Sequence, residues 1–191
     1  MTLLLLPNDP RSGAEFSEDR VYRYKLWRHW GPESEPSKVA CFCMLNPSTA
    51  NENDLDPTLR RCVAFAKSWS CTGMVVVNLF AVVSADPTIL LTQEDAIGDT
   101  PRNTTLGRIV TNTNVILQEV EQSHVLMLGW GAFPEAVGRA KQVFEMLEKY
   151  GAAPQCLGTT QSGAPKHPLY VASWTPLMPY EMPACKGNEH G

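Results

Sequence analysis

Apolar runs alternate with helix-like patterns along this chain. The runs at 39–45, 73–80, 124–131 and 155–158 are largely apolar, which is typical of strands buried on both faces. Residues 20–30 instead alternate aromatic or aliphatic side chains with basic ones, which is the period of a strand with one solvent-facing side. The pattern therefore predicts a set of buried strands and one amphipathic strand.

Helix signals lie between these strands. Asp56 followed by Pro57 is a capping residue before a proline at the first helical position, which marks a helix start. Apolar residues at helical spacing predict further helices over 103–121 and 134–150. Asp86, also followed by a proline, predicts a short helix.

The order of elements predicts the fold class. Strands that alternate with helices form parallel sheets, because parallel neighbours need a crossover connection. We therefore expect an α/β protein: a three-layer αβα sandwich with a central, mostly parallel four-stranded sheet, plus an N-terminal strand or hairpin. With 191 residues we expect a single domain over 1–191, with 1–19 as an N-terminal arm and 182–191 as a flexible tail.

Net charge and hydropathy bear on whether the protein binds nucleic acid or a membrane. The net charge of −4 gives no general attraction to a polyanion, so nucleic-acid binding needs a local basic patch. The apolar opening at 1–7 is too short to span a bilayer and lacks a basic leader region. We expect no membrane partner and a cytoplasmic location, and the sequence leaves the oligomeric state open.

Cysteine and glycine spacing argue against a cofactor. The 6 cysteines include no C-x-x-C pair, and the 4 histidines are far apart in sequence, so we expect no metal. Cysteines flanked by apolar residues are typical of reduced core thiols. No glycine-rich phosphate fingerprint follows any predicted strand, so we expect no Rossmann or P-loop site and no cofactor.

Polar residues stand where the predicted strands end. Pro47 forces its predecessor out of the helical region, so Asn46 is held at the carboxyl end of a buried strand. Asn78 closes the next strand, and Trp130 with Gly131 closes a third. Ligands of open α/β sheets bind at this edge. We therefore expect the functional site there.

Several motifs resemble an uncharacterised family of small bacterial and phage proteins. The resemblance covers nearly the whole chain. The motifs are Met44-Leu45-Asn46-Pro47-Ser48-Thr49-Ala50, Asp56-Pro57-Thr58, Arg60-Arg61-Cys62, Asn78-Leu79-Phe80-Ala81, Gly129-Trp130-Gly131 and Gly163-Ala164-Pro165-Lys166-His167-Pro168-Leu169-Tyr170. This domain-of-unknown-function family implies no activity by itself.

More distantly, the order of motifs is similar to that of the uracil-DNA glycosylase superfamily. Its members have a strand ending in Gly-x-Asn-Pro or Gly-x-Asp-Pro, a strand ending in Asn, a Leu-Leu-Trp-Gly-like strand and a closing His-Pro-Ser loop. This resemblance implies a nucleobase-recognising enzyme that hydrolyses or exchanges an N-glycosidic bond. Its expected partner is nucleic acid (DNA) or a free nucleotide, with a modified or flipped base as target.

The same resemblance implies roles for particular residues. The catalytic pair would be Asn46, which orients water, and His167, which stabilises the departing base anion. Base recognition would involve Asn78, Trp130 and Phe133, and the loop that fills the gap in the base stack would carry Leu169 and Tyr170.

A phosphate site is expected at the start of the helix that follows Asp56. The helix N-terminus attracts anions, and hydroxyl and guanidinium groups complete such sites. The candidate phosphate ligands are Ser48, Thr49, Arg60 and Arg61. The alternative is that these arginines pair with Glu52, Asp54 or Asp56.

The basic strand at 20–30 has two interpretations. Its cations Arg23, Lys25 and Arg28 stand among aromatic side chains, a mixture that suits single-stranded nucleic acid. The alternative is a solvated strand face.

The chain also departs from the glycosylase pattern. Met44 and Leu45 stand where glycine is usual, and Leu169 stands where serine is expected. Asn46 occupies a slot that often carries a carboxylate, so water activation would be asparagine-type unless Asp54 or Asp56 acts as general base.

Structural alternatives therefore stay open. Asn46 and Asn78 are also typical Asx-turn or capping residues, His167 a typical loop residue, and Trp130 a typical core residue. The corresponding alternative function is a non-catalytic module that binds a nucleotide or modified base, in phage DNA modification or defence.

Overall fold

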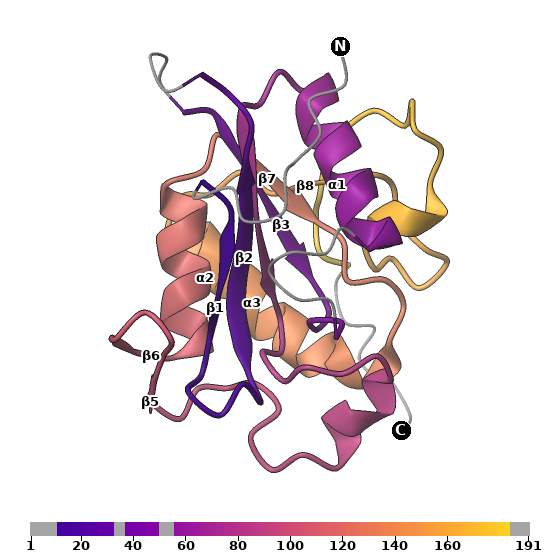
Figure 1. The fold of residues 1–191 in the computed structure, drawn as a ribbon. Coiled ribbons are helices and arrows are strands. Elements are labelled where there is room, and N and C mark those ends of the chain that lie inside the picture. Colours follow the sequence, from indigo (N-terminus) through magenta and orange to yellow (C-terminus); the bar gives the residue numbers. More distant parts are fainter. Residues whose placement is uncertain (1–10, 33–36, 50–55, 184–191) are drawn as a thin grey trace, which may run out of the picture.

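The computed structural model describes residues 11–32, 37–49 and 56–183, most of which surround one seven-stranded sheet (Figure 1). Its strands are β1 (Gly13–Phe16), β2 (Arg23–His29), β3 (Val39–Met44), β4 (Gly73–Asn78), β7 (Val125–Leu128), β8 (Gln155–Cys156) and β9 (Met178–Pro179). They lie in the order β1-β2-β4-β3-β7-β8-β9. A separate hairpin is formed by β5 (Arg102–Asn103) and β6 (Ile109–Val110).

Three α-helices and three short 3-10 helices connect the strands of the described chain. The α-helices are α1 (Pro57–Ser68), α2 (Asn112–Glu121) and α3 (Val137–Lys149). The 3-10 helices are η1 (Pro87–Leu91), η2 (Pro134–Ala136) and η3 (Pro168–Tyr170).

The α/β class is confirmed, but the expected four-stranded, mostly parallel sheet is wrong in size and in strand direction. The neighbours β4-β3-β7-β8 pair in parallel. Strands β1 and β2 pair antiparallel with each other, β2 pairs antiparallel with β4, and β9 pairs antiparallel with β8. The expected N-terminal strand or hairpin is present as the β1–β2 pair. Antiparallel neighbours need no helical crossover, so strand–helix alternation did not predict that this hairpin and β9 extend the central sheet.

The sheet carries a core on each face. Cys41 and Cys43 of β3 point into a cluster that includes residues of α2 and α3, whereas Phe42 and Met44 point into a cluster with α1. Figure 1 accordingly shows α1 on one side of the sheet and α2 and α3 on the other. Alternating side chains of one strand therefore separate an α1 face from an α2/α3 face.

Helix α1 begins where its sequence signal predicts. The Asp56 side chain accepts a hydrogen bond from the Leu59 N–H at 2.7 Å, and Pro57 occupies the first turn. An N-cap of this kind satisfies an amide that the helix itself leaves without a partner. The helix buries Leu59, Cys62, Val63, Phe65 and Ala66 against the sheet.

The helix expected over 103–121 is wrong in its first half. The region before α2 contains the β5–β6 hairpin, whose turn places Gly107 at φ +72°, a left-handed conformation that favours glycine. Helix α2 starts only after Thr111, whose hydroxyl accepts from the Asn114 N–H at 3.3 Å. Leu106 and Ile109, which complete the helical spacing, are exposed. A helix with this spacing would therefore have no core for its apolar face to pack against.

The cysteines in the described chain are free and buried core thiols, as expected. Burial raises the pKa of the Cys43 thiol to about 12, so it stays protonated at neutral pH. Cys185 lies outside the described residues.

Several expectations at the chain ends fall partly outside the described residues. Residues 1–10 of the expected arm do so, and the rest of the arm contributes β1 to the sheet. Of the expected flexible tail, only Met182 and Pro183 are described. None of the helices in the described segments combines the length and hydropathy required for a membrane span.

Candidate functional site at the carboxyl edge of the sheet

The ends of the parallel strands meet a loop that follows β8. Asn78 at the end of β4 pairs in register with Met44 at the end of β3. The Gly129 N–H, just after β7, donates to the Cys43 carbonyl at 2.9 Å. A Cβ on Gly129 would lie 3.1 Å from Cδ of Pro168, so η3 packs directly on this edge. The loop around His167 therefore closes the edge that Asn78 occupies.

Asn78 is a buried amide with its hydrogen-bonding capacity unused. Its exposed fraction is 1%, and neither its side-chain oxygen nor its side-chain nitrogen has a partner within the described part of the chain. Its register with Met44 puts the side chain on the α1 face. An unsatisfied buried polar group costs about 1–3 kcal/mol, so Asn78 is a candidate for a group that a ligand or a water completes.

The backbone around Asn78 is fixed from the opposite face. The Asn112 side-chain nitrogen donates to the carbonyls of Asn78 and Leu79 at 3.0 and 3.2 Å. Arg139 Nε adds a bond to the Leu79 carbonyl at 3.0 Å. The Asn78 side chain is thus held in place without contributing a hydrogen bond of its own.

His167 is a half-buried imidazole that caps η3. Its Nδ1 accepts from the Leu169 N–H at 3.3 Å, so the proton of the neutral ring is on Nε2. Burial lowers the pKa of His167, and the Asp56 carboxylate opposes this shift without cancelling it. His167 is therefore neutral at pH 7, with Nε2–H as a hydrogen-bond donor.

Ser48 and Asp56 join the loop after β3 to the first turn of α1. The Ser48 hydroxyl donates to Asp56 Oδ2 at 2.8 Å, while Asp56 Oδ1 caps the helix. Each carboxylate oxygen accepts one hydrogen bond and keeps a second lone pair. Asp56 is also the negative charge that raises the pKa of His167 against the effect of burial.

The Asn46 side-chain nitrogen makes hydrogen bonds to two loops at the edge of the sheet. Its side-chain nitrogen donates to the Ser84 carbonyl at 3.0 Å and to the Pro47 carbonyl at 3.2 Å. The Ser84 N–H in turn donates to the Pro47 carbonyl at 2.9 Å. The amide nitrogen of Asn46 therefore ties the loop after β3 to the loop after β4.

Arg23 enters the site through an irregularity in β2. The β1–β2 register shifts by one residue between Arg23 and Lys25. Lys25 faces α2, where its Nζ lies 2.6 Å from Glu119, whereas Arg23 Nη1 lies 3.5 Å from the Ser48 carbonyl on the α1 side. Such a bulge re-aims a side chain. It leaves Arg23 only 3% exposed, so the solvated-face interpretation is wrong for this residue.

The expected phosphate ligands separate into two groups. Arg61 donates to the backbone carbonyls of Pro168 and Val171 and lies 5.1 Å from the Phe65 ring centre, so it fastens η3 to α1. Arg60 and Thr49 are exposed, and Ser48 is bound to Asp56. The alternative partners Glu52 and Asp54 lie outside the described residues.

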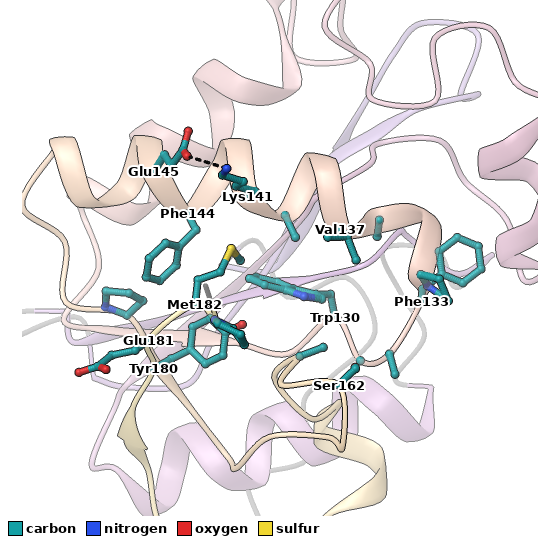
Figure 2. Close-up of a pocket in the computed structure, with 18 of the residues that line it drawn as sticks. Trp130, Phe133, Val137, Lys141, Phe144, Glu145, Ser162, Tyr180, Glu181 and Met182 are labelled. Atoms are coloured by element: carbon teal, nitrogen blue, oxygen red, sulfur yellow. Dashed lines mark ion pairs between the residues drawn. The ribbon is translucent and has the colours of Figure 1, made fainter. Parts of the chain in front are cut away.

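Trp130 and Phe133 lie on the other face of the sheet from Asn78. The Trp130 ring is 5% exposed and packs edge-on against Tyr180, with ring centres 6.0 Å apart. Both Trp130 and Phe133 line a pocket beside α3 (Figure 2). The expected base-recognition set is therefore not gathered around one cavity.

The expected intercalating loop presents one aromatic side chain to solvent. Tyr170 is 81% exposed, and its ring centre lies 5.6 Å from that of His167. Leu169 is half-buried. The same loop exposes Trp174, which sequence reasoning missed because it follows no motif.

The described residues contain no group of three or more His, Cys, Asp or Glu side chains that could hold a metal ion.

The class defined by this geometry is an α/β protein with a candidate ligand site at the carboxyl edge of its parallel strands. The chain belongs to the family described as "Protein of unknown function (DUF1643)", whose model matches residues 23–169. The matched range includes Arg23, Asn78, Asp56 and His167. No curated protein and no solved structure matches the chain.

Proposed function

We propose that the carboxyl edge binds a nucleobase, and that the protein hydrolyses or exchanges an N-glycosidic bond in DNA or in a nucleotide. The observation that carries this proposal is the unpartnered Asn78 amide. An amide offers one acceptor and two donors side by side, and asparagine reads the edge of a base in this bidentate manner. A bound base would supply the partners that Asn78 lacks.

His167 supplies the second element of the proposal. Cleavage of the bond to a base places negative charge on that base, and a pre-oriented donor stabilises it most strongly in a water-poor site. A neutral imidazole with Nε2–H as donor fits this role, because Nδ1 is already occupied by the Leu169 N–H. Arg23 adds a buried positive charge on the same face.

The reaction needs one water. Its oxygen forms a bond to C1′ of the sugar, the C1′–N bond breaks, and the bonding electron pair leaves with the base. One water proton passes to a base such as the Asp56 carboxylate or to solvent, and the released base later takes up a proton. The chain's own residues orient the base and stabilise its charge.

A three-layer, uracil-DNA-glycosylase-like arrangement belongs to the same proposal. The parallel set β4-β3-β7-β8, with α1 on one face and α2 and α3 on the other, supports it.

A non-catalytic base-binding module is the second candidate. It is favoured because the groups that would activate water, Asn46 and Asp56, already make hydrogen bonds within the protein. The Asn46 amide nitrogen is engaged by two carbonyls, and both Asp56 oxygens already accept hydrogen bonds. Binding through Asn78 needs neither group. Such a module would serve recognition of modified bases, in phage DNA modification or defence.

The two candidates differ in one assay. The protein is incubated with oligonucleotides containing uracil, hypoxanthine or 5-hydroxymethylated pyrimidines, and abasic sites are then cleaved with alkali. If the protein is the enzyme, we expect strand scission on at least one substrate. Scission should be lost in His167→Ala and kept in the control His124→Ala, because His124 is exposed and lies just before β7. Binding without scission identifies the module, and neither binding nor scission contradicts both candidates.

A further inference from the structure

A second site lies on the face opposite Asn78. A pocket of about 1150 Å³ opens between α3, the turn after β7, the loop at 161–164 and the segment after β9 (Figure 2). Its size is that of a cavity for a small organic molecule. The segment at 180–183, which follows β9, forms one wall, with Tyr180 and Met182 in the lining.

The interior of this pocket is aromatic. Trp130, Phe144 and Tyr180 are buried, and Tyr180 meets the other two rings edge-on at centre distances of 6.0 and 5.7 Å. Figure 2 shows Trp130 between Phe133 on one side and Phe144 with Tyr180 on the other. Aromatic walls bind apolar groups by contact, and the faces of their rings also attract cations.

The Trp130 indole gives the pocket a free donor. Its N–H donates to no side chain or carbonyl in the described ranges, and it is not among the polar atoms sealed inside the core. The N–H is therefore open to the pocket, where it can donate to water. An acceptor atom on a bound molecule can take the place of that water.

The rim of the pocket is acidic. Its charged lining residues are Lys141, Glu145, Glu148 and Glu181. Lys141 lies 3.7 Å from Glu145 and offsets that charge, whereas Glu148 and Glu181 pair with no cation of the described chain. Two uncompensated carboxylates above aromatic walls favour a positively charged occupant and disfavour an anion.

We propose that this pocket binds a small organic cation that combines an apolar body, an ammonium group and a carbonyl or hydroxyl acceptor. The apolar body packs on Phe144 and Tyr180, the acceptor meets the Trp130 N–H, and the ammonium group lies toward Glu148 and Glu181. The site is separate from the Asn78 edge and does not depend on nucleobase binding.

L-Phenylalaninamide is a suitable probe, because it carries a ring, a carbonyl and an α-amino group that is protonated at pH 6. N-Acetylphenylalaninamide is the neutral match, and N-acetylphenylalanine is the anionic match. Binding is followed by titration calorimetry and by the Trp130 indole N–H signal in ¹H–¹⁵N spectra, assigned by its disappearance in Trp130→Phe. We expect L-phenylalaninamide to bind at least about tenfold more tightly than N-acetylphenylalanine. The rim carboxylates attract the ammonium group of the first probe and repel the carboxylate of the second.

Rim variants test the charge without touching the core. Glu148→Gln and Glu181→Gln should each lower the affinity for L-phenylalaninamide by about two- to fivefold, as expected for exposed charge pairs. The matched control Glu121→Gln on α2 should leave this affinity unchanged. Trp130→Phe keeps an aromatic ring, removes the indole donor, and should weaken binding of the probe by about two- to tenfold. Thermal denaturation shows whether this core variant is folded.

Three outcomes overturn the proposal: no binding of the probe, equal affinity for the three charge states, or cation binding that the rim variants and Trp130→Phe all leave unchanged. Because nucleobase-containing ligands are absent from these measurements, failure here does not affect the function proposed for the Asn78 edge, and loss of that function would not affect this pocket.

Discussion

The Ser48 hydroxyl donates a hydrogen bond of 2.8 Å to Asp56 Oδ2, which couples the loop after β3 to the N-terminus of α1. The same carboxylate caps the helix through Leu59 and is the negative charge acting on His167. One side chain therefore links the loop, the helix and the imidazole.

This linkage predicts different losses for two variants. Asp56→Ala removes the cap and the serine contact, and should lower the free energy of unfolding by about 1–2 kcal/mol. Ser48→Ala removes the hydroxyl that donates to Asp56 but leaves the helix cap in place, and should cost about 0.5–1.5 kcal/mol. In urea denaturation of both variants and their combination, the effects should be less than additive. Additive losses would show that the two side chains do not interact.

Asn78 and Asn112 form a matched pair with opposite expectations. Asn112→Leu removes two donors to backbone carbonyls and should destabilise the protein by about 1–3 kcal/mol. Asn78→Leu removes two unsatisfied buried atoms and should leave stability unchanged or raise it by up to about 1–3 kcal/mol. Base binding should nevertheless be lost in Asn78→Leu. The measurements are urea denaturation and nucleobase titration.

Equal destabilisation by the two asparagine variants would mean that Asn78 has partners in solution. A stable Asn78→Leu protein that still binds the base would remove Asn78 from the proposed site.

The lowered pKa of His167 predicts a pH dependence of stability. Between its folded pKa and the unfolded value of about 6.5, the unfolded chain binds more protons, so the free energy of unfolding rises with pH in this window. The contribution of neutral His167 to the free energy of unfolding is lost as the pH falls through its folded pKa. An NMR titration of the His167 ring measures the pKa directly, with His167→Gln used to assign its signal.

Asp56→Asn tests the electrostatic part of this shift. Removing the carboxylate should lower the pKa of His167 further, because Asp56 is the group that raises it. A pKa at or above about 6.5 in the unaltered protein would contradict burial as its main cause.

We expect two neighbouring arginines of α1 to have different roles: Arg61 anchors η3, whereas Arg60 is a candidate phosphate contact. Arg61→Ala frees η3 from two carbonyl contacts and should reduce the free energy of unfolding by about 1–3 kcal/mol. Arg60 is exposed, so Arg60→Ala should cost less stability than Arg61→Ala. If Arg60 contacts a phosphate of bound DNA, this variant reduces the slope of log K against log salt by about 1. An unaltered slope argues against that contact.

Several elements could be predicted because their signals are local. The parallel strands β3, β4 and β7 each lie within a predicted apolar run, and α1 begins at the predicted Asp56–Pro57 signal. A cap, a proline and a run of buried positions depend on neighbours within a few residues. The sequence also identified the strand-end residue Asn78 and the loop residue His167 as candidates.

The parts that failed depend on distant contacts. The exposed Leu106 and Ile109 have helical spacing but no surface to cover, so that segment folds as a hairpin. Arg23 belongs to an alternating strand, and only its pairing with β1 creates the bulge that turns it inward. Periodicity does not record such pairings.

By itself, the sequence determined the α/β class, the strands of the parallel set and the residues that close them, since each rests on short-range steric and hydrophobic preferences. Tertiary structure decided which face each side chain occupies. It separated Trp130 from Asn78 by the thickness of the sheet and turned the Asn46 amide to the Ser84 carbonyl, while the Asn78 amide was left without a partner in the described chain. The physical reason is that a side chain's partners come from strands and loops far away in sequence.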